Sequence, residues 1–125
     1  MDIKDIKFKA KLLDTGEWIE GDLIRSMTPI RMCTPHSVFP DIPIVHRVDP
    51  ATVCQFTGLK DCEGNEVWEG DIVEFETYDL YKGNVKTEAV IEYTSSGYVA
   101  VTDNIPYSLC TKCIKVVGNK FDKEK

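Results

Sequence analysis

The sequence contains two short motifs whose residue types could bind a metal ion. One is Cys33-Thr34-Pro35-His36 and the other is Cys110-Thr111-Lys112-Cys113. Cysteine sulfur and histidine nitrogen are ligands that zinc prefers, and a gap of two residues lets both members of a pair reach one ion. A zinc site from Cys33, His36, Cys110 and Cys113 therefore stays open as an alternative. Each half is common by chance, so we expect ordinary thiols, no metal and no cofactor.

Catalytic chemistry finds little support in the residue patterns. A redox Cys110–Cys113 pair needs its first cysteine at a helix N-terminus, whereas a strand-like pattern, Ile114-Lys115-Val116-Val117, follows here. Neither His36 nor His46 stands in a nucleophile signature, and no glycine-rich phosphate loop is present. We predict that the protein is not an enzyme.

The cysteine count and the hydropathy indicate where the protein acts. Five cysteines, an odd number, occur in a chain that starts with a charged segment instead of an apolar signal. We therefore expect thiols in a reducing compartment, not a disulfide framework. No apolar run is long enough to span a bilayer. These features predict a cytoplasmic protein that does not contact a membrane.

An acidic segment and a neighbouring aromatic loop are the best candidates for binding. Residues 61–79 carry eight Asp or Glu and no Lys or Arg, in a chain whose net charge is −6. Such a segment repels nucleic acid and favours a cationic partner or simply solubility. The predicted loop 78–84 holds Tyr78, Leu80 and Tyr81, side chains of the kind that anchor interfaces, unless they cap the end of a barrel. Our binding candidates are therefore Tyr78, Leu80, Tyr81, Glu74 and Glu76.

Nucleic-acid binding is the rival function. The first predicted strand, residues 6–13, and the segment before it carry Lys4, Lys7, Lys9 and Lys11. Acidic neighbours dilute this basic surface, so we favour a solvated strand face over a nucleic-acid site.

The remaining pattern predicts short strands separated by turns. Period-two alternation appears in residues 6–13, 53–57 and 72–76, and residues 85–101 have the pattern of a hairpin. Four prolines interrupt residues 26–48, which we interpret as an irregular, apolar excursion with short edge strands, packed down as a cover. Glu20-Gly21-Asp22 and Glu69-Gly70-Asp71 repeat one motif, which we expect to form two turns that each enter a curved strand.

These residues carry a family resemblance. The blocks "GEWIEGDLI" and, above all, "VDPATVCQFTGLKDCEGNEVWEGDIVEF" resemble the YopX family of phage and prophage proteins. The resemblance implies a mostly β protein with an SH3-like barrel portion, and it supplies no catalytic residues. The tail Lys-Phe-Asp-Lys-Glu-Lys departs from the usual ending of the family.

We therefore predict a mainly β protein with little helix. A smaller N-terminal β lobe, residues 1–48, precedes an SH3-like barrel portion at residues 49–119 and a frayed tail at residues 120–125. The expected function is that of a non-enzymatic accessory protein that binds an unknown host or phage protein, with nucleic acid disfavoured. A homo-oligomer stays open.

Overall fold

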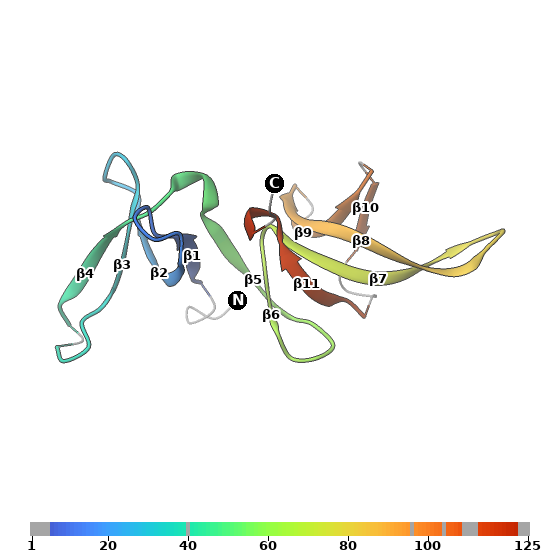
Figure 1. The fold of residues 1–125 in the computed structure, drawn as a ribbon, viewed down its shortest axis with the longest axis horizontal. Coiled ribbons are helices and arrows are strands. Elements are labelled where there is room, and N and C mark those ends of the chain that lie inside the picture. Colours follow the sequence, from blue (N-terminus) through green and yellow to red (C-terminus); the bar gives the residue numbers. More distant parts are fainter. Residues whose placement is uncertain (1–5, 40, 96, 104, 109–112, 123–125) are drawn as a thin grey trace. The chain divides into compact units, whose positions relative to one another are not determined.

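The computed structural model describes residues 6–39, 41–95, 97–103, 105–108 and 113–122 of the 125-residue chain (Figure 1). The prediction of a mainly β fold is confirmed, because short 3-10 helices are the only helices among these residues. The chain divides into two compact units, Met1–Phe56 and Thr57–Lys125.

The first unit is built on antiparallel strands. They are β1 (Phe8–Lys11), β2 (Trp18–Ile24), β3 (Arg31–Pro35), β4 (Pro43–Arg47) and β5 (Cys54–Lys60), of which β5 runs on past the unit boundary. The sheet has the order β4-β3-β2-β1-β5-β6, where β6 is Glu66–Trp68. Its core is a small cluster of Ala10, Met32 and Val48. A short 3-10 helix, η2 (Pro50–Thr52), precedes β5, and the Asp49 carboxylate accepts a hydrogen bond from the Ala51 N–H at its start.

The first Glu-Gly-Asp motif does not form the turn that we predicted. Gly21 and Asp22 lie inside β2, which runs without a break from Trp18 to Ile24. A Cβ at Gly21 would collide with the backbone carbonyl oxygen of Cys33 on β3, so glycine is needed there for close strand packing and not for a bend. The second motif is a turn, because Gly70 has a φ of 88° and separates β6 from β7.

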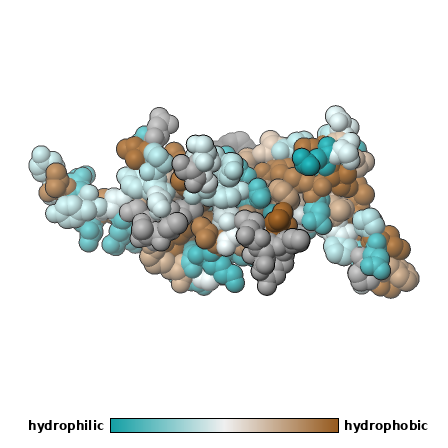
Figure 2. Space-filling model, turned by 180° about the vertical axis from the view of Figure 1, so that it is seen from behind, coloured by the Kyte–Doolittle hydropathy of each residue, from teal (hydrophilic) through white to brown (hydrophobic). Residues whose placement is uncertain are grey.

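The prediction of a short edge strand within residues 26–48 is confirmed by β4, but the prediction that the segment packs down as a cover is wrong. The segment forms the β3–β4 hairpin, in which Pro35 ends one strand and Pro43 begins the edge strand, two positions where a strand tolerates proline. Met32 packs into the core. The apolar side chains on and near the connection are exposed, and Figure 2 shows brown apolar surface over this part of the unit; they are Val38, Phe39, Ile42, Ile44 and Val45.

The second unit contains one five-stranded antiparallel sheet of order β10-β9-β8-β7-β11. The strands are β7 (Asp71–Asp79), β8 (Gly83–Thr94), β9 (Gly97–Thr102), β10 (Ile105–Ser108) and β11 (Lys115–Asn119), with β6 (Glu66–Trp68) before them. Its strand order is that of an open sheet, so an SH3-like closure stays a prediction.

The core of the second unit is larger than that of the first. Alternation along β7 and β8 points Val73, Phe75, Ala89 and Ile91 to one side, as the sequence predicted for β7. They join three further buried residues, Val67, Ala100 and Ile114. Residues 120–122, which we assigned to the tail, form the 3-10 helix η3 (Lys120–Asp122), whose Lys120 N–H donates to the Gly70 carbonyl.

Candidate functional site

The predicted loop 78–84 is the tip of a long hairpin. β7 continues to Asp79 and β8 begins at Gly83, so that Tyr78 pairs with Asn84 and Asp79 with Gly83. The pairing of β11 with β7 covers residues 71–74, and that of β9 with β8 covers residues 90–94. Beyond these limits the hairpin continues as the two-stranded ribbon that projects from the sheet in Figure 1. The tip is therefore held out from the rest of its unit.

The three large side chains at the tip are exposed. Tyr78, Leu80 and Tyr81 have exposed fractions of 71%, 83% and 96%. The alternative that they cap the end of a barrel is therefore wrong. Such exposure of neighbouring aromatic and aliphatic side chains leaves their apolar surface in water, where a partner could bury it.

A carboxylate fixes the backbone of the tip. Oδ1 of Asp79 accepts hydrogen bonds from the N–H of Tyr81, at 2.8 Å, and of Lys82, at 3.0 Å. An aspartate that bonds the backbone two and three residues ahead gives the turn one preferred conformation. The aromatic tip is thus ordered before any partner binds.

The two candidate glutamates share a face of β7 with Tyr78. Glu74, Glu76 and Tyr78 alternate with the buried Val73 and Phe75. The Lys86 ammonium lies 3.7 Å from the Glu74 carboxylate, whereas Glu76 is exposed opposite Lys86. The structure therefore brings Tyr78 and both glutamates to one surface, with Leu80 and Tyr81 at its end.

The acidic segment as a whole is not a single binding surface. Asp71 is buried, accepts from the Trp68 N–H at 2.7 Å and from the Asn119 side-chain amide at 3.0 Å, and so joins the β6–β7 turn to the end of β11. Asp61 is also buried and Asp79 fixes the hairpin tip. Three of the eight carboxylates therefore organise turns, a role that the charge count alone did not reveal.

Asp61 holds the turn between β5 and β6 against the start of β11. Its carboxylate accepts from the backbone N–H of Glu63, Asn65 and Val116 at 2.9, 2.8 and 3.0 Å, and from the Asn65 side-chain amide at 3.3 Å. Burial opposes the charge on this carboxylate, but the hydrogen bonds outweigh burial and lower the pKa of Asp61 below its usual 3.8. Asp61 therefore stabilises the fold as an anion.

The cysteine prediction is wrong for two of the five residues. Cys62, in the Asp61 turn, forms a disulfide with Cys113, just before β11, and their Cα atoms are 5.8 Å apart. Cys33 and Cys54 are thiols and not part of a disulfide, as expected. The two bonded cysteines are 51 residues apart, a separation that carries no pairing signal in the sequence, and only the fold brings them together.

Three of the four suggested zinc ligands have other partners or lie outside the described residues, and the fourth, Cys33, is a thiol. Nδ1 of His36 accepts from the N–H of Val38 and Phe39, and Cys113 is bonded to Cys62. Cys110 is among the residues that the structure does not describe. Within the described ranges, no three or more His, Cys, Asp or Glu side chains are grouped so that they could hold a metal ion.

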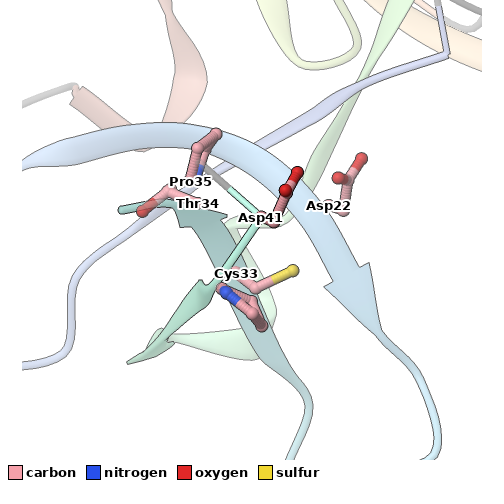
Figure 3. A pocket seen from close by; sticks show the side chains of 6 residues that line it. Asp22, Cys33, Thr34, Pro35 and Asp41 are labelled. Atoms are coloured by element: carbon pink, nitrogen blue, oxygen red, sulfur yellow. The ribbon is translucent and has the colours of Figure 1, made fainter. Parts of the chain in front are cut away.

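A shallow pocket lies in the first unit, beside β2, β3 and β4 (Figure 3). Its cavity volume is about 240 Å³. Asp22, Asp41 and the Cys33 thiol lie around this opening, and both carboxylates are exposed. The pocket is open to water, and its carboxylates make it acidic. The remaining lining residues are Thr34, Pro35 and Pro43.

The lysines of β1, and Lys7 just before it, lie over aromatic rings. The Lys9 and Lys11 ammonium groups are 4.7 and 5.4 Å from the centre of the Trp18 ring. Lys7 lies 4.8 Å from the Phe56 ring and 3.9 Å from the Glu20 carboxylate. This surface combines basic and aromatic groups, and each cation–π contact contributes about 0.5–1 kcal/mol where it is exposed. Lys4 lies outside the described residues.

The fold and this geometry define a mainly β protein of two antiparallel sheets that presents an ordered aromatic hairpin. The chain belongs to the YopX protein family, whose model matches residues 7–124. The family resemblance stated from the sequence is thereby confirmed. No curated protein and no solved structure matches the chain. Among the described residues, no helix has the length and apolar character required to cross a bilayer.

Proposed function

We propose that the chain is a non-enzymatic protein-binding module whose binding element is the tip of the β7–β8 hairpin. The observation that carries this proposal is the exposure of Tyr78, Leu80 and Tyr81 on a backbone already ordered by Asp79. An ordered tip loses little conformational entropy on binding, so more of the energy gained by burying the side chains contributes to affinity. Tyrosine is also enriched among the residues that dominate binding energies.

The chemistry of the hairpin supports a partner with an apolar pocket and a basic rim. The three tip side chains fill the pocket, while Glu76 and the exposed edge of Glu74 face cationic groups around it. We infer that the partner is a host or phage protein in the cytoplasm of a bacterial cell, and that the chain is an accessory protein of phage or prophage origin.

Differential capture tests this proposal. Tagged full-length protein is incubated with host lysate after nuclease treatment, and the captured proteins are quantified by mass spectrometry. We expect a protein that the unchanged chain enriches at least about tenfold more than the Y78A/Y81A variant does, since central aromatic anchors each contribute about 2 kcal/mol or more. The Tyr93→Ala variant is the matched control, because Tyr93 is an exposed tyrosine of β8 outside the tip. Equal enrichment by the unchanged chain and the Y78A/Y81A variant would contradict the proposal.

Nucleic acid is the second candidate ligand, and the basic–aromatic surface of β1 favours it. Lys9 and Lys11 beside Trp18 resemble the combination with which proteins bind the phosphates and bases of single strands. If this surface binds, affinity for a labelled oligonucleotide should fall steeply with salt. The K9A/K11A variant should bind more weakly and with a shallower salt dependence, whereas Lys115→Ala, on β11, should not change binding.

A further inference from the structure

Two cysteines that the fold brings together lie on the surface of the second unit. Cys62 and Cys113 are both exposed, with a Cα–Cα distance inside the range that a disulfide requires. Cys62 lies in the turn between β5 and β6, and Cys113 lies two residues before β11 begins. Small thiols and disulfides in solution can therefore reach both positions.

Contacts that do not involve sulfur hold the two cysteines in place. The Cys62 N–H donates to the Ile114 carbonyl at 3.0 Å, which joins the backbone beside one cysteine to the backbone beside the other. The Val116 N–H also donates to the Asp61 carboxylate at 3.0 Å. Neither of these hydrogen bonds involves a sulfur atom. We therefore expect the two thiols of the reduced protein to face each other at a high effective concentration.

We propose that Cys62 and Cys113 form a reversible redox latch that exchanges with low-molecular-weight disulfides such as glutathione disulfide. In the forward step, the thiolate of one cysteine attacks a glutathione disulfide, forms a mixed disulfide and releases one glutathione thiolate. The second cysteine thiolate then attacks the protein sulfur of the mixed disulfide and displaces the second glutathione. The protein loses two electrons and two protons, and glutathione disulfide gains them to become two molecules of glutathione.

The latch acts on the strand that borders the binding hairpin. β11 is the neighbour of β7, with Lys115 opposite Glu74 and Val116 opposite Val73. Oxidation ties the Asp61 turn covalently to the start of β11 and so fixes this edge of the sheet. The latch concerns the stability of the second unit and does not depend on a partner at the hairpin tip. Asp61 is a positioning residue of the latch because it holds the turn that carries Cys62.

Redox titration of the full chain tests the proposal. The protein is equilibrated in buffers of varied glutathione and glutathione disulfide, quenched with acid, alkylated and analysed by peptide mapping. We expect one Cys62–Cys113 disulfide per chain, both in the unchanged protein and in the Cys110→Ser variant. Oxidised protein should melt at least about 5 °C higher than reduced protein, and the C62S/C113S variant should lose this difference. A disulfide mapped instead between Cys110 and Cys113 would overturn the latch.

The Asp61→Asn variant distinguishes a prearranged latch from two thiols that meet by chance. Loss of the carboxylate weakens the turn by about the strength of one hydrogen bond, so the oxidised form should be reduced about tenfold more readily. Glu63→Gln is the control, because it removes only an exposed ion pair and should leave the titration within about twofold. An unchanged titration for Asp61→Asn would show that the turn does not position Cys62. If Asp61→Asn does not fold, the mapping and melting of the Cys110→Ser and C62S/C113S variants still decide the proposal.

Discussion

The two units of the chain each carry a hairpin with an exposed apolar connection, yet they support it differently. Among the described residues of β3–β4, only Met32 belongs to the buried core cluster of the first unit, which has three described members. In β7–β8 four side chains of the hairpin itself belong to a core of seven. Both connections are exposed, and the β7–β8 tip differs in the larger core that supports the base from which it projects.

The connections of the two hairpins are ordered by the same device. Nδ1 of His36 accepts from the N–H of Val38 and Phe39, and Oδ1 of Asp79 accepts from the N–H of Tyr81 and Lys82. A neutral ring nitrogen is the weaker acceptor, because a hydrogen bond to a carboxylate is assisted by charge. The β7–β8 tip is therefore also the more firmly held of the two.

The largest expected effect concerns the two cores. Ile91→Ala and Met32→Ala each remove a fully buried side chain and should each lower the free energy of unfolding by about 2–5 kcal/mol. The chain has two tryptophans, Trp18 in the first unit and Trp68 in the second, so fluorescence of single-tryptophan variants reports each unit. Ile91→Ala should shift mainly the Trp68 transition and Met32→Ala mainly the Trp18 transition. Equal shifts of both transitions by either variant would show that the two units unfold together, and would contradict the view that each unit is stabilised by its own core.

The next effect concerns the polar anchor of the second unit. Asp61→Asn should lower the free energy of unfolding by about 1–3 kcal/mol at neutral pH, because three backbone N–H groups lose their charged, buried acceptor. The folded protein lowers the pKa of Asp61, so its stabilising contribution is present above the usual 3.8 and is lost as the pH falls through the lower, folded-state value. Denaturant unfolding at several pH values measures how the contribution of Asp61 to the free energy of unfolding depends on pH. The gap between the unchanged chain and Asp61→Asn should narrow below about pH 3.8, and a gap that widened there would contradict the assignment.

A smaller effect concerns the two ordered connections. Asp79→Ala should lower the free energy of unfolding by about 0.5–1.5 kcal/mol. It should also speed hydrogen exchange at the Tyr81 and Lys82 amides. His36→Ala should speed exchange at the Val38 and Phe39 amides and should lower the free energy of unfolding by less. Hydrogen exchange followed by NMR at each amide distinguishes the effects on the two connections. Unchanged exchange at Tyr81 in Asp79→Ala would mean that the carboxylate does not order the tip.

The smallest expected effect concerns the ionisation of Tyr98, on β9 of the second unit. Burial, with the nearby Glu69 carboxylate and Tyr93, raises the pKa of Tyr98 to about 12. Between pH 10 and this value the unfolded chain ionises Tyr98 and the folded chain does not, so stability should fall as the pH rises through this range. Ultraviolet absorbance of phenolate should show one late-titrating tyrosine, which Tyr98→Phe removes. Loss of a different titration step in that variant would refute the assignment.

The sequence predicted the strands wherever period-two alternation was strong. Val73 and Phe75 point inward in β7, and the hairpin with its turn near Gly97 is present as β8 and β9. Alternation is a local property, so it is visible without knowledge of the partner strands. The sequence also singled out Tyr78, Leu80 and Tyr81 as binding candidates and placed them in a loop, whereas the structure places them, exposed, at a hairpin end.

The errors arose where residues distant in the sequence decide the structure. Gly21 was predicted to bend the chain, but its role is set by the Cys33 carbonyl on a neighbouring strand. The Cys62–Cys113 disulfide depends on the docking of the Asp61 turn beside Ile114, which no local pattern encodes. The exposure of Phe39 likewise follows from its position at a hairpin connection, which apolar composition alone did not reveal.

Site-specific crosslinking tests directly whether the β7–β8 tip binds a protein. A photoreactive phenylalanine derivative is placed at Tyr81 in one variant and, as the matched position on the other hairpin, at Phe39 in a second variant. Each is irradiated in nuclease-treated host lysate. We expect a single crosslinked protein from position 81, which is lost when Tyr78→Ala is added, and no such product from position 39. A crosslink from position 39 alone, or from neither position, would contradict the assignment of the β7–β8 tip as the binding element.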